Sequence, residues 1–256
     1  VEQFTNKLLF EEELSPKTVK DILVVLRSIL NYIAKRFPDA FPRVDIVYPR
    51  ENKKEMRVLT REEQAKFIRF LLKDIDTCKF GVLLALLTGI RIGELCALRW
   101  ENISLRDNTI RISSTMQRLK DMNPNREAKT KIVIGSPKSG TSTRTIPISD
   151  YAAELCGKMN PQRPTAFVLT GTSDYMEPRT LQYRMEKYTA ECGLEGVHFH
   201  TLRHTFATRC VEVGFEIKSL SEILGHANTT ITLERYVHSS MELKRHNMNK
   251  LVMVEP

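Results

Sequence analysis

The chain has 256 residues, of which 41% are hydrophobic and 27% are charged, a balance typical of a soluble globular protein with one large domain or a large and a small one. No apolar run is long enough to cross a bilayer and no secretory pattern opens the chain, which argues against a membrane or secreted protein. The formal net charge of +8 at pH 7 fits a polyanionic partner, although a merely basic surface would give the same value.

The five cysteines are scattered along the chain and form no Cys-x-x-Cys pair. An odd, scattered set predicts reduced thiols in an intracellular protein and argues against a disulfide framework or a zinc site. Residues 1–56 carry ten basic and nine acidic side chains, so most of the net positive charge lies in the rest of the chain. The chain begins with Val1 rather than Met, and we expect it to be part of a longer protein.

Near the N-terminus, Ser15 and Pro16 predict a helix start, because Ser caps helices and Pro fits their first turn. Apolar residues then recur at helical spacing and form one stripe: Val19, Ile22, Leu23, Leu26, Ile29, Leu30 and Ile33. The helix should end at Phe37 and Pro38. Because a single helix cannot bury such a stripe alone, we expect its neighbours to precede Val1.

The remainder of the chain predicts a mostly α domain with one small antiparallel sheet (α+β). A capping box at Thr60 and Glu63 starts its first helix, Gly89 is a helix-stopping residue, and strand signals follow between turn residues. The helices are expected at 60–73, at 78–87, from Arg91 onward, at 150–159 and at 179–192, and the strands at 109–113, 131–134 and 143–148.

Three further segments complete the prediction. Residues 43–56 combine Pro49 with a charged run, which suits an exposed linker between two lobes. Residues 136–142 are rich in Gly, Ser, Thr and Pro, which predicts a loop that bears Lys138. Residues 241–251 have the pattern of a final amphipathic helix.

The C-terminal third contains side chains suited to phosphate chemistry. On a helix, His200 and Arg203 lie three positions apart and share a face. A Leu-Gly pair predicts a helix end just before His226, and Tyr236 follows ten positions later. Arginine makes bidentate contacts with phosphate, imidazole transfers protons near pH 7, and a phenol becomes a nucleophile when it is activated.

Three blocks in order carry a resemblance to a known family. The first, Thr88 to Leu95, reads TGIRIGEL and contains Arg91. The second has Lys138 between Pro and Ser, followed by RTIPI from Arg144. The third reads HTLRHTFAT and then LGHANTTITLERYVH. In this order and spacing they resemble the tyrosine recombinases, the phage-integrase family, and in particular integrases of phages or conjugative transposons.

The resemblance implies a domain division and a chemistry. Residues 1–48 would be the C-terminal part of a helical core-binding domain, 49–56 an interdomain linker and 57–256 the catalytic domain. The enzyme would cleave and rejoin DNA strands through a 3′-phosphotyrosine intermediate. The implied roles are Tyr236 as nucleophile, Arg91 and Arg203 as clamps on the nonbridging oxygens, His226 as hydrogen-bond donor to one of them, His200 as acceptor of the tyrosine proton, Lys138 as proton donor to the departing 5′ oxygen, and Glu94 as support for Arg91.

The residue types alone leave alternatives open for several of these positions. His200 and Lys138 could exchange their proton-transfer roles, and Lys131 or Arg144 could replace Lys138. Tyr236 could be an ordinary half-buried tyrosine. His204, which follows Arg203, is expected to pack in the interior rather than to take part in the chemistry. A surface ion pair between the arginine and the glutamate of the first block would also explain those two residues.

The resemblance implies double-stranded DNA as partner, a homotetramer on DNA as the working form, and leaves room for an accessory excision factor. It implies no metal, no high-energy cofactor and no membrane, and a place at the nucleoid in a bacterial cytoplasm. Two other functions fit part of the pattern: an enzyme similar to the type IB topoisomerases, and a DNA-binding protein that cuts nothing.

Overall fold

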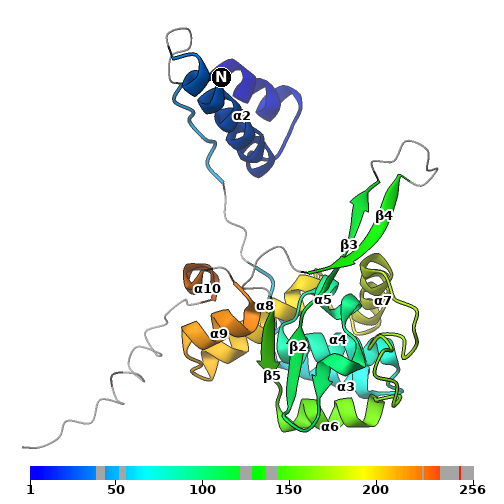
Figure 1. The fold of residues 1–256 in the computed structure, drawn as a ribbon. Helices are drawn as coiled ribbons and strands as arrows, with labels where there is room; N and C mark the ends of the chain where they lie inside the picture. The colour runs from blue at the N-terminus through cyan, green and yellow to red at the C-terminus, as the bar shows by residue number, and fades with distance from the viewer. Residues whose placement is uncertain are drawn as a thin grey trace, which may run out of the picture. The chain divides into compact units, whose positions relative to one another are not determined.

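The computed structural model comprises two compact units, residues 1–55 and residues 56–256 (Figure 1). The described residues are 1–38, 44–51, 56–121, 129–136, 143–226, 228–236 and 248, with the backbone alone for 234–236. The predicted position of Lys138 lies outside the described residues, as does the predicted final helix except for Met248.

The first unit is built around α2 (Pro16–Arg36), which follows α1 (Glu2–Asn6) and a short π-helix, η1 (Lys7–Glu11). Ser15 caps α2, because its hydroxyl oxygen accepts a hydrogen bond from the backbone N–H of Thr18 at 3.2 Å. The helix ends at Arg36, immediately before the predicted Phe-Pro stop. Its predicted boundaries are therefore confirmed.

Only part of the apolar stripe of α2 is buried within the first unit. Val19 and Leu23 are fully buried, whereas Ile29 is 51% exposed. Glu51 lies close to the helix, because Lys20 Nζ is 2.7 Å from one of its carboxylate oxygens. Both side chains of this pair are partly exposed, so it adds little to stability.

The second unit is organised around α4 (Thr77–Thr88), in which nine of the twelve residues are buried. Before it comes α3 (Arg61–Leu72), which begins with the predicted capping box. The hydroxyl of Thr60 accepts from the backbone N–H of Glu63 at 3.2 Å, and the Glu63 carboxylate accepts from the backbone N–H of Thr60 at 2.8 Å. Gly89 ends α4 in the left-handed conformation, with φ of +67°.

The remaining helices enclose α4 and extend from it toward the C-terminus (Figure 1). They are α5 (Ile92–Ala97), the 3₁₀ helix η2 (Trp100–Asn102), α6 (Asp150–Met159), α7 (Pro178–Glu191), α8 (Phe199–Glu212), α9 (Ile217–Leu224) and α10 (Thr229–Tyr236). The helices α8, α9 and α10 contact one another, and α8 also packs on α4. The segments that carry the third sequence block therefore lie beside the end of α4.

The strands form two small antiparallel sheets instead of the single sheet expected from the sequence. One has the order β1-β2-β5, with β1 (Ile103–Ser104), β2 (Thr109–Ile112) and β5 (Arg144–Pro147). The other is a hairpin of β3 (Thr115–Lys120) and β4 (Thr130–Gly135) that extends beyond the helices (Figure 1). Sequence patterns do not predict β3 because half of its residues are exposed, which weakens the strand signal. The mostly α fold with small antiparallel sheets is as predicted.

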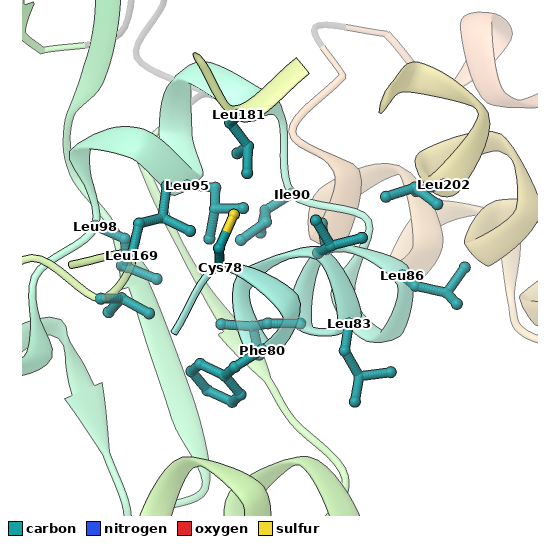
Figure 2. Packing of buried hydrophobic residues seen from close by; sticks show 14 of the residues in the cluster. Cys78, Phe80, Leu83, Leu86, Ile90, Leu95, Leu98, Leu169, Leu181 and Leu202 are labelled. Carbon is teal, nitrogen blue, oxygen red and sulfur yellow. The ribbon is translucent and has the colours of Figure 1, made fainter. Parts of the chain in front are cut away.

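One hydrophobic core holds the second unit together. Figure 2 shows Phe80, Leu83 and Leu86 of α4 surrounded by apolar side chains from neighbouring segments, including Leu202 of α8. Trp100 fills the core as predicted, and its ring stacks on Phe80 with 5.8 Å between centroids. No helix in the described parts of the chain is long and apolar enough to span a membrane.

Candidate active site

Arg203 lies on the inner face of α8 and joins the ends of two other helices. Its Nη1 donates to the carbonyl oxygen of Gly89 at 2.8 Å, and its Nη2 donates to that of Leu224 at 2.7 Å. These carbonyls end α4 and α9, where helix geometry leaves acceptors without intrahelical partners and the helix dipole favours a cation. The residue is only 2% exposed, so its charge is enclosed by the protein.

Arg91 lies at the start of α5, two residues after the glycine that ends α4. Its Nη1 donates to Oε1 of Glu94 at 2.8 Å and its Nη2 donates to the carbonyl oxygen of Gly225 at 2.9 Å. The backbone N–H of Arg91 donates to the other oxygen of Glu94 at 2.9 Å. The Arg91 side chain is 35% exposed, so solvent or a ligand can reach it.

The two arginines converge on the same turn of backbone. Their acceptors Leu224 and Gly225 are consecutive residues, and His226 follows directly. Gly225 has φ of +63° and ends α9, as the sequence predicted. Residues from the first and third sequence blocks therefore meet at one helix end.

His226 is held by a residue of the next helix. Its Nδ1 lies 2.8 Å from the hydroxyl oxygen of Thr232, a fully buried residue of α10. When the threonine hydroxyl donates to Nδ1, the neutral imidazole carries its proton on Nε2. In that tautomer, Nε2 can donate a hydrogen bond to a phosphate oxygen.

His200 and His204 occupy successive turns of α8, with their ring centroids 4.6 Å apart in a perpendicular arrangement. His200 is exposed and His204 is 8% exposed. This exposure is consistent with the expectation that His204 serves packing. It leaves His200 accessible to a proton donor outside the helix.

Tyr236 is the last residue of α10, and the structure describes its backbone alone. Lys138 lies outside the described residues, whereas Lys131 and Arg144, the two alternatives for its role, lie within them. Lys131 is 48% exposed on β4, where its Nζ lies 3.5 Å from an Asp121 oxygen. Arg144 lies at the start of β5, and its side chain is buried at 6% exposure.

Arg144 is the residue whose importance the sequence did not reveal. Its Nη1 and Nη2 donate to the two oxygens of Glu94, each at 2.9 Å, in the parallel geometry of a bidentate pair. Its Nε donates to the carbonyl oxygen of Ile223 at 2.6 Å. The Thr-Ile-Pro-Ile run after it predicted a strand, and a charged residue opening a strand gave no sign of burial.

Glu94 is the carboxylate at the centre of this arrangement and is 3% exposed. Burial raises its pKa, but the hydrogen bonds and charges of Arg144 and Arg91 lower it by more than burial raises it. The pKa therefore lies below the ordinary value of 4.5. The carboxylate is therefore ionised near neutral pH. Three guanidiniums and one carboxylate leave a net positive charge, which suits a dianionic or developing negative charge on a phosphate.

Within the described ranges, no three His, Cys, Asp or Glu side chains are grouped closely enough to hold a metal ion. The charged side chains that gather at the end of α9 are mainly arginines. An arrangement of this kind stabilises negative charge through fixed donors, as an oxyanion hole does. It can bind a phosphodiester and support its transfer to a nucleophile.

Comparison with solved structures finds proteins of similar fold. The integrase of transposon Tn1549, solved in complex with a circular intermediate DNA, superposes with a TM-score of 0.76 over 95% of this chain and 82% of that one. The sequences are 21% identical, so this likeness shows the fold alone.

Two curated relatives match over most of this chain. A tyrosine recombinase XerC-like protein of Caldanaerobacter subterraneus is 29% identical over 261 residues, which cover 93% of this chain and 66% of the relative. A tyrosine recombinase of Pseudothermotoga lettingae is 28% identical over 264 residues, which cover 98% of this chain and 81% of that protein. The model of the phage integrase family matches residues 57–242. The chain belongs to the phage integrase family.

Proposed function

We propose that this chain is a site-specific DNA recombinase, an integrase that cleaves and rejoins strands through a 3′-phosphotyrosine intermediate on Tyr236. The observation that carries the proposal is the meeting of Arg91 and Arg203 on consecutive carbonyls directly before His226. Fixed donors of this kind stabilise charge that develops on a phosphate in the transition state. Family membership and the names of the relatives support the same reaction class.

The proposed reaction conserves the energy of the phosphodiester bond. The phenolic oxygen of Tyr236 attacks phosphorus, and the bond between phosphorus and the 5′ oxygen breaks. His200 accepts the phenolic proton, and Lys138 gives a proton to the departing 5′ oxygen. Rejoining is the reverse attack by a 5′ hydroxyl, so neither a metal nor a high-energy cofactor is required.

The exposure of Arg91 and Arg203 would determine how each contacts the phosphate. Arg91 is accessible and makes the outer contact with a nonbridging oxygen. Because Arg203 is only 2% exposed, its contact with phosphate requires a covering group, such as the carbonyl of Leu224, to move when DNA binds. His226 donates from Nε2 to a nonbridging oxygen, and Glu94 orients Arg91.

The proposal extends to the domains and partners. Residues 1–48 would be the C-terminal part of a core-binding domain, 49–56 a linker and 57–256 the catalytic domain. The partner would be double-stranded DNA, and the working form a homotetramer on DNA with room for an accessory excision factor. The chain spans 66% of the length of the Caldanaerobacter relative, and the activity of the whole protein is part of the proposal.

Covalent trapping on a library of DNA duplexes tests this function and finds the target site in the same experiment. We would incubate the chain in EDTA with duplexes randomised on both sides of a single nick, because loss of the short fragment past the nick blocks rejoining. A protein–DNA adduct that survives denaturation is expected, and sequencing of the trapped ends would give the target. Tyr236→Phe should bind DNA and form no adduct.

Two results would contradict the proposal. A wild-type protein that binds DNA and forms no adduct on any duplex of the library would be a binding protein without strand-cleaving activity. Relaxation of supercoiled plasmids irrespective of their sequence would identify a topoisomerase. DNA binding should also weaken steeply as salt rises, because phosphate contacts release counterions.

A further inference from the structure

Three consecutive carbonyl oxygens at the end of α9 each accept a hydrogen bond from a different arginine. In chain order, the donor-acceptor pairs are Arg144 Nε to Ile223 at 2.6 Å, Arg203 Nη2 to Leu224 at 2.7 Å and Arg91 Nη2 to Gly225 at 2.9 Å. The last carbonyls of a helix lack intrahelical partners, and cations are favoured there. Arg144 therefore belongs to the same arrangement as the two arginines of the family motifs.

Arg144 is connected to Arg91 through a shared carboxylate. Oε1 of Glu94 accepts from Nη1 of both arginines, and Oε2 accepts from the backbone of Arg91 and from Nη2 of Arg144. The Arg144 and Glu94 side chains are 6% and 3% exposed. A bidentate pair of two buried groups fixes both in one orientation, so the Glu94 oxygens face Arg91 from a rigid position.

The charges of these three residues have a direct consequence for Arg91. Arg91 and Glu94 by themselves would form a neutral pair, and a neutral pair stabilises the negative charge that develops on a phosphate poorly. With Arg144 included, the sum of two positive charges and one negative charge is +1. Because the Arg144 side chain is 6% exposed and the Arg91 side chain is 35% exposed, the excess charge acts through Arg91 on the charge that develops during cleavage.

Arg144 also lies against the turn that carries His226. A Cβ built on Gly225 would come 3.0 Å from Cδ and from Nη1 of Arg144, and φ of Gly225 is +63°. The backbone of the turn thus rests directly on the Arg144 side chain. Any displacement of this side chain would move the carbonyl acceptor of Arg91 and the backbone of His226 together.

We propose that Arg144 is a positioning residue for strand cleavage: it fixes Glu94 and the Gly225 turn, and through them sets the places of Arg91 and His226 without touching the phosphate. This inference rests on the proposed function, since it assigns a role within the cleavage step. It predicts that loss of Arg144 slows cleavage much more than it weakens DNA binding. Misplacement of a catalytic group by about 1 Å can cost about 100-fold in rate.

The test compares Arg144→Lys and Arg144→Met with Arg106→Met. The Arg106→Met substitution removes the same charge as Arg144→Met, but at an exposed turn. Single-turnover adduct formation is measured at saturating concentrations of the trapped duplex, and DNA affinity is measured separately. We expect both Arg144 variants to form adduct about 10- to 100-fold more slowly, with affinity within about threefold of wild type because the site retains its other cations. Arg106→Met should match wild type in rate.

Folding defects are separated from positioning by a double variant. Arg144→Met leaves a buried carboxylate with fewer donors, which is destabilising, and Glu94→Gln removes that carboxylate. The Glu94→Gln/Arg144→Met protein should recover stability relative to Arg144→Met and still cleave slowly. Wild-type cleavage by a folded Arg144→Lys protein, or recovery of rate together with stability in the double variant, would overturn the inference. Absence of adduct from the wild-type protein would instead overturn the proposed function.

Discussion

Arg91 and Arg203 donate hydrogen bonds to the carbonyl oxygens of neighbouring residues, Gly225 at 2.9 Å and Leu224 at 2.7 Å, yet they differ in exposure. The Arg91 side chain is 35% exposed, whereas Arg203 as a residue is 2% exposed. One guanidinium therefore faces outward from the helix end and the other is enclosed by it. Their contributions to stability and to catalysis should separate accordingly.

Replacement of each arginine by methionine should show this separation. Arg203→Met leaves two buried carbonyl acceptors without their donor, and we expect it to lower the free energy of unfolding by about 1–3 kcal/mol per acceptor. Arg91→Met should lower it by less than about 1 kcal/mol, because Arg144 continues to pair with Glu94 and the Arg91 side chain is 35% exposed. Both variants should lose adduct formation by about 100-fold or more.

Urea unfolding followed by circular dichroism measures the first quantity, and single-turnover trapping measures the second. Equal destabilisation by the two substitutions would contradict the enclosed position of Arg203. Normal cleavage by either variant would contradict its place in the site.

The pH dependence of stability should report on Glu94. Burial raises its pKa, but Arg144 and Arg91 lower it more, and the folded-state pKa lies below 4.5. A lowered carboxyl pKa contributes stability that is present above the unfolded-state pKa and is lost as pH falls through the folded-state pKa. Glu94→Gln should therefore be less stable than wild type near pH 7 and should lose less stability on acidification below about pH 4.5.

Unfolding curves between neutral pH and pH 3 would check this, with Glu154→Gln as the control. Glu154 also has a lowered pKa, because Lys158 forms a hydrogen bond with it, but the pair lies in solvent on α6. Its removal should change little. If the unfolding free energy of Glu94→Gln fell with pH in parallel with that of wild type, protonation of Glu94 would not be the cause of the loss of stability in acid.

Gly225 and Gly196 form a matched pair of left-handed glycines. Their φ angles are +63° and +65°, but a Cβ on Gly225 would meet Arg144 at 3.0 Å whereas one on Gly196 meets nothing within 4 Å. Alanine at either position should cost about 1–2 kcal/mol in unfolding free energy from backbone strain. Only Gly225→Ala should also slow adduct formation, because it displaces Arg144 and the turn before His226.

Rates and unfolding free energies of the two glycine variants would be measured under the same conditions. If Gly196→Ala slowed cleavage as much as Gly225→Ala, strain alone would account for the effect. The contact with Arg144 would then have no part in it.

Thr232 should control the orientation of His226. Thr232→Val removes the hydroxyl 2.8 Å from Nδ1 and keeps the shape of the side chain, so the imidazole loses a partner that selects its tautomer. We expect adduct formation to slow by about 10-fold, as for other groups that orient a functional histidine. Thr230→Val, an exposed position on the same helix, should leave the rate unchanged.

The pH profile of the single-turnover rate provides a second readout for this pair. A Thr232→Val protein that cleaves at the wild-type rate across the profile would show that the hydroxyl does not orient the ring. A slow Thr230→Val protein would point to a general disturbance of α10.

Local signals in the sequence were sufficient for most of the helices. The caps at Ser15 and Thr60 and the stop at Gly225 depend on neighbours within a few positions, and each is present as predicted. The strand from Thr115 to Lys120 was missed, because its stability comes from pairing with β4 and not from its own alternation. Residues that satisfy their backbone locally are visible in sequence, and those that depend on a partner strand are not.

The sequence predicted the motif residues of the site but not the hydrogen bonds that link them to Arg144. The motif residues Arg91, Arg203 and His226 were expected to converge, and the structure brings them to one helix end. The role of Arg144 depends on Glu94, fifty positions away, and on a backbone carbonyl of α9, and neither leaves a pattern in the sequence. Burial of the Arg203 side chain likewise follows from the packing of α8 on α4.

The acceptors at the end of α9 are main-chain oxygens, and this has a consequence for how the site responds to substitution. Replacing the side chains of Ile223 or Leu224 leaves these oxygens in place, so scanning mutagenesis of α9 would not report contacts on which three guanidiniums depend. Substitution of these side chains is thus compatible with the same anchor for the three cations. A change to the course of the chain, such as a proline or a one-residue deletion in the last turn of α9, would remove the anchor.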